Sequence, residues 1–108
     1  MKRVYVASAV GSLVGRRARV EAAIEAGKQI AAAGMAPFIP HLLDPWFLDH
    51  GFDYEDCMAH CMVWLAQCEA VFRVLNHSLG ADREVAWARA NGLPVFTSLE
   101  DLARWSRG

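Results

Sequence analysis

The sequence predicts an α/β domain with a parallel sheet. β-rich runs and helical patterns alternate in the order βαβαβαβα, and no repeat, linker or low-complexity segment interrupts them. The 108 residues are 55% hydrophobic and 21% charged, which suits one compact domain, residues 1–108, with a substantial core. We therefore expect a three-layer sandwich of Rossmann-like or flavodoxin-like type, with helices on both faces of a parallel sheet of four or five strands.

The first half of the chain predicts two strands joined by a helix. Residues 4–7 are a short β-rich run that ends in small residues, so they read as a strand feeding a loop. Residues 16–33 keep apolar positions at helical spacing, and Gly34 is a C-terminal stop. These apolar positions are Val20, Ile24, Gly27, Ile30 and Ala31. Residues 35–39 predict a second strand, closed by Pro40.

A long loop and a cysteine-bearing helix follow. Residues 40–51, PHLLDPWFLDHG, mix two prolines with aromatic and acidic side chains, which is typical of a functional loop with room for one helical turn. Residues 54–67 predict a helix with an apolar stripe. The stripe consists of Tyr54, Cys57, Met58, Cys61, Met62, Leu65 and Cys68. A metal site would need a fourth ligand, and the sequence contains neither a CxxC nor an HxxxH pair. We therefore interpret the cysteines as buried and reduced and expect no metal.

The second half completes the alternation. Residues 70–75, AVFRVL, predict a third strand, and residues 81–90 a helix stopped by Gly92. Residues 94–96 predict a fourth strand, and Ser98 is expected to cap a last short helix. In sheets of this kind the ligand lies at the carboxyl ends of the strands, where the loops after the first and third strands converge.

Charge and hydropathy exclude two classes of partner. Lys and Arg total 11 against 12 for Asp and Glu, a formal charge of -1, so the chain lacks the basic excess of a nucleic-acid binder. No apolar run approaches the roughly 18 residues that a membrane-spanning helix requires, and the start of the sequence lacks a signal-peptide pattern. We expect a soluble cytoplasmic protein without a nucleic-acid or membrane partner.

One carboxylate stands where the helical pattern places the core. At about 100° per residue, Ala81, Val85 and Ala88 share a narrow apolar face, and Glu84 falls in the middle of it. A carboxylate against an apolar wall is suited to act as a nucleophile or base, and a helix N-terminus nearby is suited to an anion such as phosphate. The alternative is a helix-terminus charge that pairs with Arg83, Arg16 or Arg17.

The segment around this glutamate resembles a known family. SLGADREVAWA is similar to the signature of the nucleoside 2-deoxyribosyltransferase superfamily, which includes 2'-deoxynucleoside 5'-monophosphate N-glycosidases. In that family a Ser-x-Gly-x-x-x-Glu run follows the third strand, and its glutamate is the nucleophile. The resemblance assigns these positions to Ser78, Gly80 and Glu84. YVASAV resembles the strand-one motif, whose tyrosine hydroxyl touches the catalytic glutamate, and this implies Tyr5.

Further substrate-binding residues follow from the resemblance and from their positions. GSLVGRR resembles the phosphate-binding loop of the nucleotide-hydrolysing members. His41 ends the second strand, His77 adjoins the signature, and Trp46 is placed to stack on a base. The full expected set is Ser8, Gly11, Ser12, Arg16, Arg17, His41, Trp46, His77, Ser78 and Gly80.

The resemblance implies a glycosidase mechanism. Glu84 attacks the anomeric carbon, the base departs, and water or another base takes the sugar from the covalent ester. The helical aspartate that many members point at the base is not evident, since His60 and Cys61 stand near its place, and Cys68-Glu69-Ala70 replaces the usual Cys-Asp-Ala. Asp44 or Asp49 in the long loop could supply the missing acid, and Asp44 is our candidate. No cofactor is required.

Two functions remain open at this point. The first is an N-glycosidase or deoxyribosyltransferase acting on a nucleoside or nucleotide. The second is a module that binds a nucleotide derivative without turnover. Members of the superfamily are dimers or larger, and four tryptophans are many for so small a core. We therefore expect a homodimer or higher homo-oligomer, with Trp64 and Trp87 covering the subunit interface.

Overall fold

A computed structural model of the chain describes residues 1–8, 15–43, 46, 50–75 and 79–108. Its centre is a four-stranded sheet in the order β2-β1-β3-β4, with every pair of neighbouring strands parallel. The strands are β1 (Arg3–Ala7), β2 (Ala36–Phe38), β3 (Ala70–Arg73) and β4 (Val95–Phe96). The expected Rossmann-like or flavodoxin-like α/β fold is therefore confirmed.

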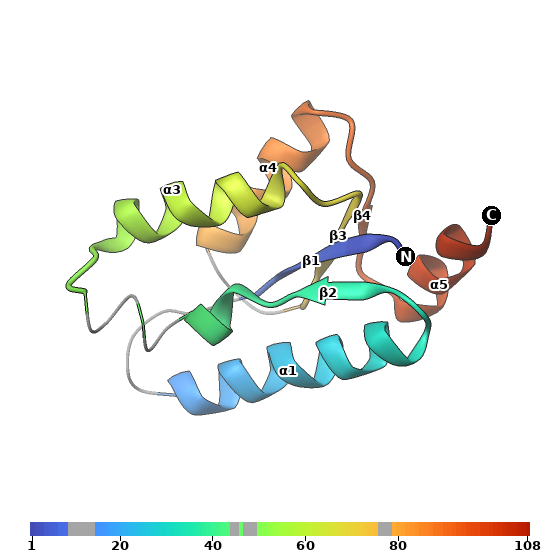
Figure 1. Cartoon of the computed structure of the whole chain (residues 1–108), viewed down its shortest axis with the longest axis horizontal. Coiled ribbons are helices and arrows are strands. Elements are labelled where there is room, and N and C mark those ends of the chain that lie inside the picture. The colour runs from blue at the N-terminus through green and yellow to red at the C-terminus, as the bar shows by residue number, and fades with distance from the viewer. Residues whose placement is uncertain (9–14, 44–45, 47–49, 76–78) are drawn as a thin grey trace.

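Helices cover both faces of the sheet. The helices are α1 (Arg16–Ala32), α3 (Tyr54–Leu65), α4 (Leu79–Ala90) and α5 (Leu99–Arg107), with a short 3-10 turn η1 (Pro40–Leu43) after β2. Figure 1 shows α1 and α5 on one side of the sheet and α3 and α4 on the other. Crossovers between parallel strands are almost always right-handed, and the chain places β2 on one side of β1 and β3 and β4 on the other, so the helices fall on both faces.

Alternation along the strands divides the core in two. On β1, Val4 and Val6 face α1 and α5, whereas Tyr5 and Ala7 face α3 and α4. The first cluster also contains Ala23, Ala26, Ile30, Met35, Ala70, Phe72 and Leu102. The second also contains Cys61, Leu65, Cys68, Val71, Ala81, Val85 and Ala88. Successive side chains of a strand point to opposite faces, so each central strand contributes to both clusters.

The buried face of α1 differs from the predicted one. Ala23 and Ala26 are buried together with Gly27 and Ile30, whereas the expected core residue Ala31 is exposed. Gly27 and Ile30 belong to the predicted face as well, and the helix packs closely at Gly27, where an added Cβ would lie 2.4 Å from Cδ1 of Ile39. Small residues bring this helix against the chain that leaves β2, with Ile30 fully buried beside them and Val20 and Ile24 half-buried.

The start of α3 is fixed by a capping box. The Asp53 side chain accepts a hydrogen bond from the Asp56 amide at 2.8 Å, and the Asp56 side chain accepts one from the Asp53 amide at 3.2 Å. This cap places Tyr54 in the first turn, where it is 52% exposed, so its predicted place in the apolar stripe was wrong. Cys61 and Cys68 are buried as expected, Cys57 is half-buried, and all three are free thiols.

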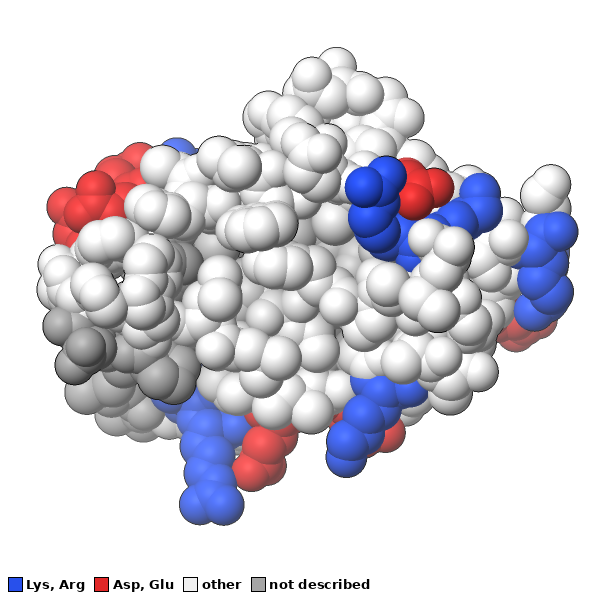
Figure 2. Space-filling view, viewed as in Figure 1, with Lys and Arg blue, Asp and Glu red and all other residues white. Residues whose placement is uncertain are grey.

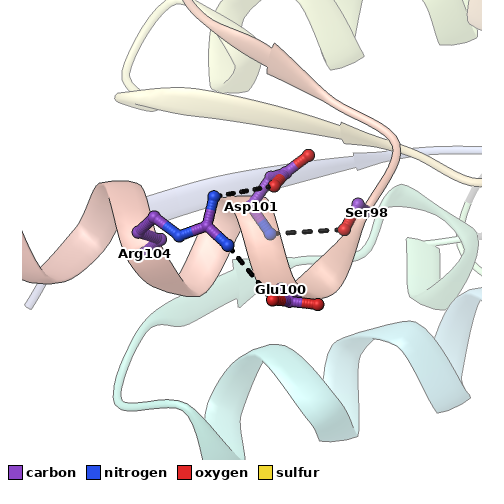
Figure 3. Close-up of polar contacts among 4 residues, drawn as sticks. All are labelled: Ser98, Glu100, Asp101 and Arg104. Carbon is purple, nitrogen blue, oxygen red and sulfur yellow. Dashed lines mark hydrogen bonds and ion pairs between the residues drawn. The ribbon is translucent and has the colours of Figure 1, made fainter.

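The last helix begins where the sequence predicts. The Ser98 hydroxyl accepts a hydrogen bond from the Asp101 amide at 3.2 Å, and Arg104 pairs with Glu100 and Asp101 one turn away (Figure 3). The acidic groups of the first turn favour the helix dipole. Within the residues that the structure describes, no helix is both long enough and apolar enough to cross a membrane.

Candidate functional site

The centre of the candidate site is a hydrogen bond between a strand and a helix. The Tyr5 hydroxyl of β1 donates to Oε2 of Glu84 on α4, across a separation of 79 residues. Tyr5 is completely buried, and Glu84 is only 5% exposed. The expected contact between these two side chains is therefore present, and Glu84 faces the sheet as its helical position predicted.

Local sequence explains how α4 reaches β1. Ala81 and Ala88 lie on the same face of the helix as Glu84, and both are buried. Their small side chains allow α4 to approach the sheet closely, which brings a carboxylate of moderate length to the tyrosine hydroxyl. The sheet order makes β1 and β3 direct neighbours, with Tyr5 opposite Val71. The loops after these strands thus start side by side, at the carboxyl ends where α/β sheets bind ligands.

Burial changes the acid–base properties of both partners. Desolvation raises the pKa of Glu84 from 4.5 to about 7, while the Tyr5 hydrogen bond and the guanidinium groups of Arg73 and Arg83 act to lower it. Burial and the nearby charge of Glu84 raise the pKa of Tyr5 above its ordinary range, as does Cys61, which hydrogen-bonds Tyr5 from α3. The tyrosine therefore remains a hydrogen-bond donor at neutral pH, and the pKa of Glu84 lies near neutral pH.

Three successive residues tie α4 to three other elements. Asp82 pairs with Arg73 of β3, with 3.4 Å between Oδ1 and Nη2. Arg83 reaches Glu55 of α3 through two hydrogen bonds, of 2.8 and 3.3 Å. Glu84 itself is bound to β1, as described above. Arg83 is thus engaged with Glu55, so the simple alternative of a Glu84–Arg83 ion pair is not the arrangement seen.

Other predicted residues lie around this end of the sheet. Ser8 directly follows β1 and is 5% exposed, and His41 lies in η1 and is 2% exposed. Arg16 and Arg17 begin α1, and Nε of Arg17 is 3.1 Å from Oε1 of Glu21. Gly80 belongs to the first turn of α4. The predictions for Gly11, Ser12, Asp44, Asp49, His77 and Ser78 lie outside the described residues.

Trp46 belongs to an aromatic cluster at the beginning of α3. Its ring is 5.0 Å from His50, 5.1 Å from Phe52 and 5.7 Å from His60, measured between centroids. The indole is nevertheless 43% exposed, so part of it remains open to a flat partner. Spacing along the sequence did not reveal this cluster, because its members come from separate turns of the chain.

Sequence reasoning missed Arg73 as a neighbour of the Tyr5–Glu84 pair. A signal existed for Arg73, because a charged residue stood inside the apolar run AVFRVL, two positions after Val71, and so on the same face of the strand. Cys61 was expected near the site only through the resemblance, which put it close to the place of the helical aspartate, and it does act on Tyr5.

A polar hollow lies at the other end of the sheet. It is lined by Met1, Lys2, Ala33, Gly34, Met35, Glu69, Ser106 and Arg107. None of the predicted site residues borders it, and it receives the amino ends of the strands, where the ligand sites of parallel sheets are not found. The buried Tyr5–Glu84 pair is therefore the stronger candidate.

Comparison with known proteins assigns the chain to a family. No match was found among curated proteins or among solved structures. A family model described as a domain of unknown function (DUF7768) matches residues 2–98, a span that contains all four strands, α1, α3 and α4 and ends before α5. Both members of the Tyr5–Glu84 pair lie inside this span. The chain belongs to the DUF7768 family.

Proposed function

We propose that this protein cleaves the N-glycosidic bond of a nucleoside or a nucleoside 5'-monophosphate, with Glu84 as the nucleophile. The observation that carries the proposal is the buried Glu84 carboxylate, held by the Tyr5 hydroxyl at the carboxyl side of neighbouring parallel strands. The resemblance of Ser78-x-Gly80-x-x-x-Glu84 to the nucleoside 2-deoxyribosyltransferase superfamily supports the same chemistry.

The chemistry needs one carboxylate and one acid. Glu84 attacks C1' of the sugar and forms an ester, while the bond to the base breaks and its electron pair leaves with the base. An acid, for which Asp44 is our candidate, protonates the leaving base. Water then hydrolyses the ester, or a second base takes the sugar. Tyr5 engages Oε2, so the other carboxylate oxygen is the one that attacks.

The substrate contacts form the second part of the proposal. The phosphate is assigned to Gly11, Ser12, Arg16 and Arg17, because amide donors and positive charge follow β1 there. The exposed part of Trp46 stacks on the base. The remaining contacts to sugar and base are assigned to Ser8, His41, His77, Ser78 and Gly80.

The direct test is a panel of nucleosides and their 5'-monophosphates, incubated with the protein and analysed for free base by chromatography. Release of base from at least one member, in proportion to protein concentration, is the expected result. A second candidate is a module that binds a nucleotide derivative without turnover. Cys61 favours it, because this thiol beside Tyr5 stands near the place where many members of the nucleoside 2-deoxyribosyltransferase superfamily have an aspartate that points at the base. Binding without base release across the panel would select this second function.

The phosphate assignment predicts a difference between two ligand classes. Replacing both Arg16 and Arg17 by alanine should weaken binding of a nucleoside monophosphate by roughly tenfold or more, because charge-assisted hydrogen bonds are lost. Binding of the matching nucleoside should change little. Isothermal titration with both ligands measures this, and Arg104→Ala on α5 serves as the control. Equal losses for the two ligands would contradict the assignment.

We also propose a homodimer or higher homo-oligomer. Val63 and Trp64 of α3 are 63% and 51% exposed, and the Trp64 ring stacks on Phe38 of the edge strand β2 at 5.6 Å. Figure 2 shows a broad uncharged area across the middle of the visible face. Light scattering at micromolar concentration should give at least a dimer mass, and Trp64→Glu should lower it. A monomer mass for the parent protein would refute the proposal.

A further inference from the structure

Arg73 is a charged side chain with little access to water. It ends β3, on the same face of the strand as Val71, and its side chain is 11% exposed. Its Nη1 donates to the backbone oxygen of Val74, and its Nη2 lies 3.4 Å from Oδ1 of Asp82. A guanidinium removed from water is costly unless partners hold it in place, so this arginine has a defined position between β3 and α4.

The position of Arg73 matters because its partner Asp82 lies on the same helix as Glu84. Asp82 lies in the first turn of α4, two residues before Glu84. An ion pair between Arg73 and Asp82 therefore fixes the helical turn that aims Glu84 at β1. It also holds the positive charge of Arg73 where it acts on the buried carboxylate of Glu84.

Among the residues that the structure describes, few charged or titratable groups act on Glu84 from the elements packed around it. Tyr5 faces it from β1, with Cys61 of α3 behind the tyrosine, and Arg73 faces it from β3. On its own helix, Arg83 also acts on it, but the Arg83 side chain is 46% exposed and is engaged with Glu55. Water screens an exposed charge far more than a buried one, so Arg73 has a stronger electrostatic effect on Glu84 than Arg83 has.

We propose that Arg73 is a positioning residue for Glu84: together with Asp82 it orients the first turns of α4 and sets the charge of the carboxylate. Its importance for base release rests on the proposed function. Its electrostatic effect on Glu84 does not, and can be measured in the protein without any substrate.

Two substitutions separate an electrostatic role from mere support of the helix. Arg73→Met and Asp82→Asn both break the same ion pair. Loss of the positive charge should raise the pKa of Glu84 by about half a pH unit or more, whereas loss of the negative charge of the more exposed Asp82 should lower it by less. A residue that only stabilises the helix gives shifts in the same direction, or none, in the two variants.

The measurement is a carbon-13 NMR titration of the glutamate side-chain carboxyl groups in the ligand-free protein, with Glu84 assigned from Glu84→Gln. Arg73→Lys keeps the charge and should restore at least part of the parent pKa. Arg104→Met, which removes an exposed arginine of α5, is the matched control and should leave Glu84 unchanged. If Arg73→Met does not fold, the downward shift in Asp82→Asn and the small effect of Arg73→Lys still decide the question.

The activity profile connects this result to catalysis. If the parent protein releases base, the acidic limb of kcat/KM should move to higher pH in Arg73→Met and to lower pH in Asp82→Asn. Shifts of the same sign in the titration, or no shift, would overturn the role of Arg73. Opposite shifts in a protein that releases no base would uphold the role of Arg73 and reject the proposed function instead.

Discussion

The Glu84→Gln variant is expected to release free base roughly a thousandfold more slowly than the parent protein, or slower still. Glutamine preserves the size of the side chain and can still accept the hydrogen bond from Tyr5, so the geometry of the site is kept. An amide oxygen, however, does not form the glycosyl ester on which the proposed reaction depends. The loss should appear in kcat, because the variant still binds the substrate.

The measurement is base release under saturating substrate, together with mass spectrometry of the quenched parent protein for a covalent sugar adduct. Glu25→Gln is the matched control, because it makes the same change on the exposed side of α1 and should retain full activity. Full turnover in a well-folded Glu84→Gln protein would rule out the nucleophile role. An effect on affinity alone, with no turnover in the parent, would identify the binding module instead.

The same substitution should make the folded protein more stable at neutral and alkaline pH. Folding raises the pKa of Glu84 from 4.5 to about 7 because burial disfavours its charged form. Between these pH values the unfolded chain loses this proton while the folded protein keeps it, so the stability contributed by the group falls as pH rises. Glu84→Gln carries no such proton, and its gain in the free energy of unfolding should reach up to about 3 kcal/mol above pH 7.

Urea unfolding at pH 4 and at pH 8 tests this expectation. The difference in unfolding free energy between Glu84→Gln and the parent should be small at pH 4, where Glu84 is protonated in both states, and should grow toward pH 8. Glu25→Gln should show no comparable growth, because that side chain is exposed. A difference that shrinks with rising pH would mean that the Glu84 carboxylate is stabilised by its surroundings.

Short-range patterns predicted the fold and the inward position of Glu84 well, whereas its contact with Tyr5 was expected from the family resemblance. The apolar face of Ala81, Val85 and Ala88 made Glu84 conspicuous, and the structure buries all four side chains. Ser98 was recognised as a cap from its position alone, and it does cap α5. These features depend on residues a few positions apart, so the sequence contains almost all the information that they need.

Features that depend on distant partners were predicted less well. The helical spacing of α1 included Ala31, but the buried face of this helix runs through Ala23 and Ala26 beside Gly27 and Ile30 and leaves Ala31 exposed. Tyr54 fitted an apolar stripe, yet its position next to the capping residue Asp53 left it exposed, where the Arg83 guanidinium lies 5.6 Å from its ring. In the sequence Arg73 interrupts an apolar strand, and its ion pair with Asp82 becomes evident only when α4 packs beside β3.

The long span of the Tyr5–Glu84 hydrogen bond has a consequence for how the chain folds. β1, α1 and β2 are neighbours in sequence, whereas this bond closes a loop of 79 residues and requires β3 to be paired with β1. Closing so long a loop costs entropy before any contact repays it, so we expect the bond to form late. Until then Glu84 is hydrated and titrates as in a free peptide. Its protonation, or the burial of its charged form, therefore belongs to the last steps of folding. Refolding should therefore slow as pH rises through the interval in which Glu84 must be buried with its charge.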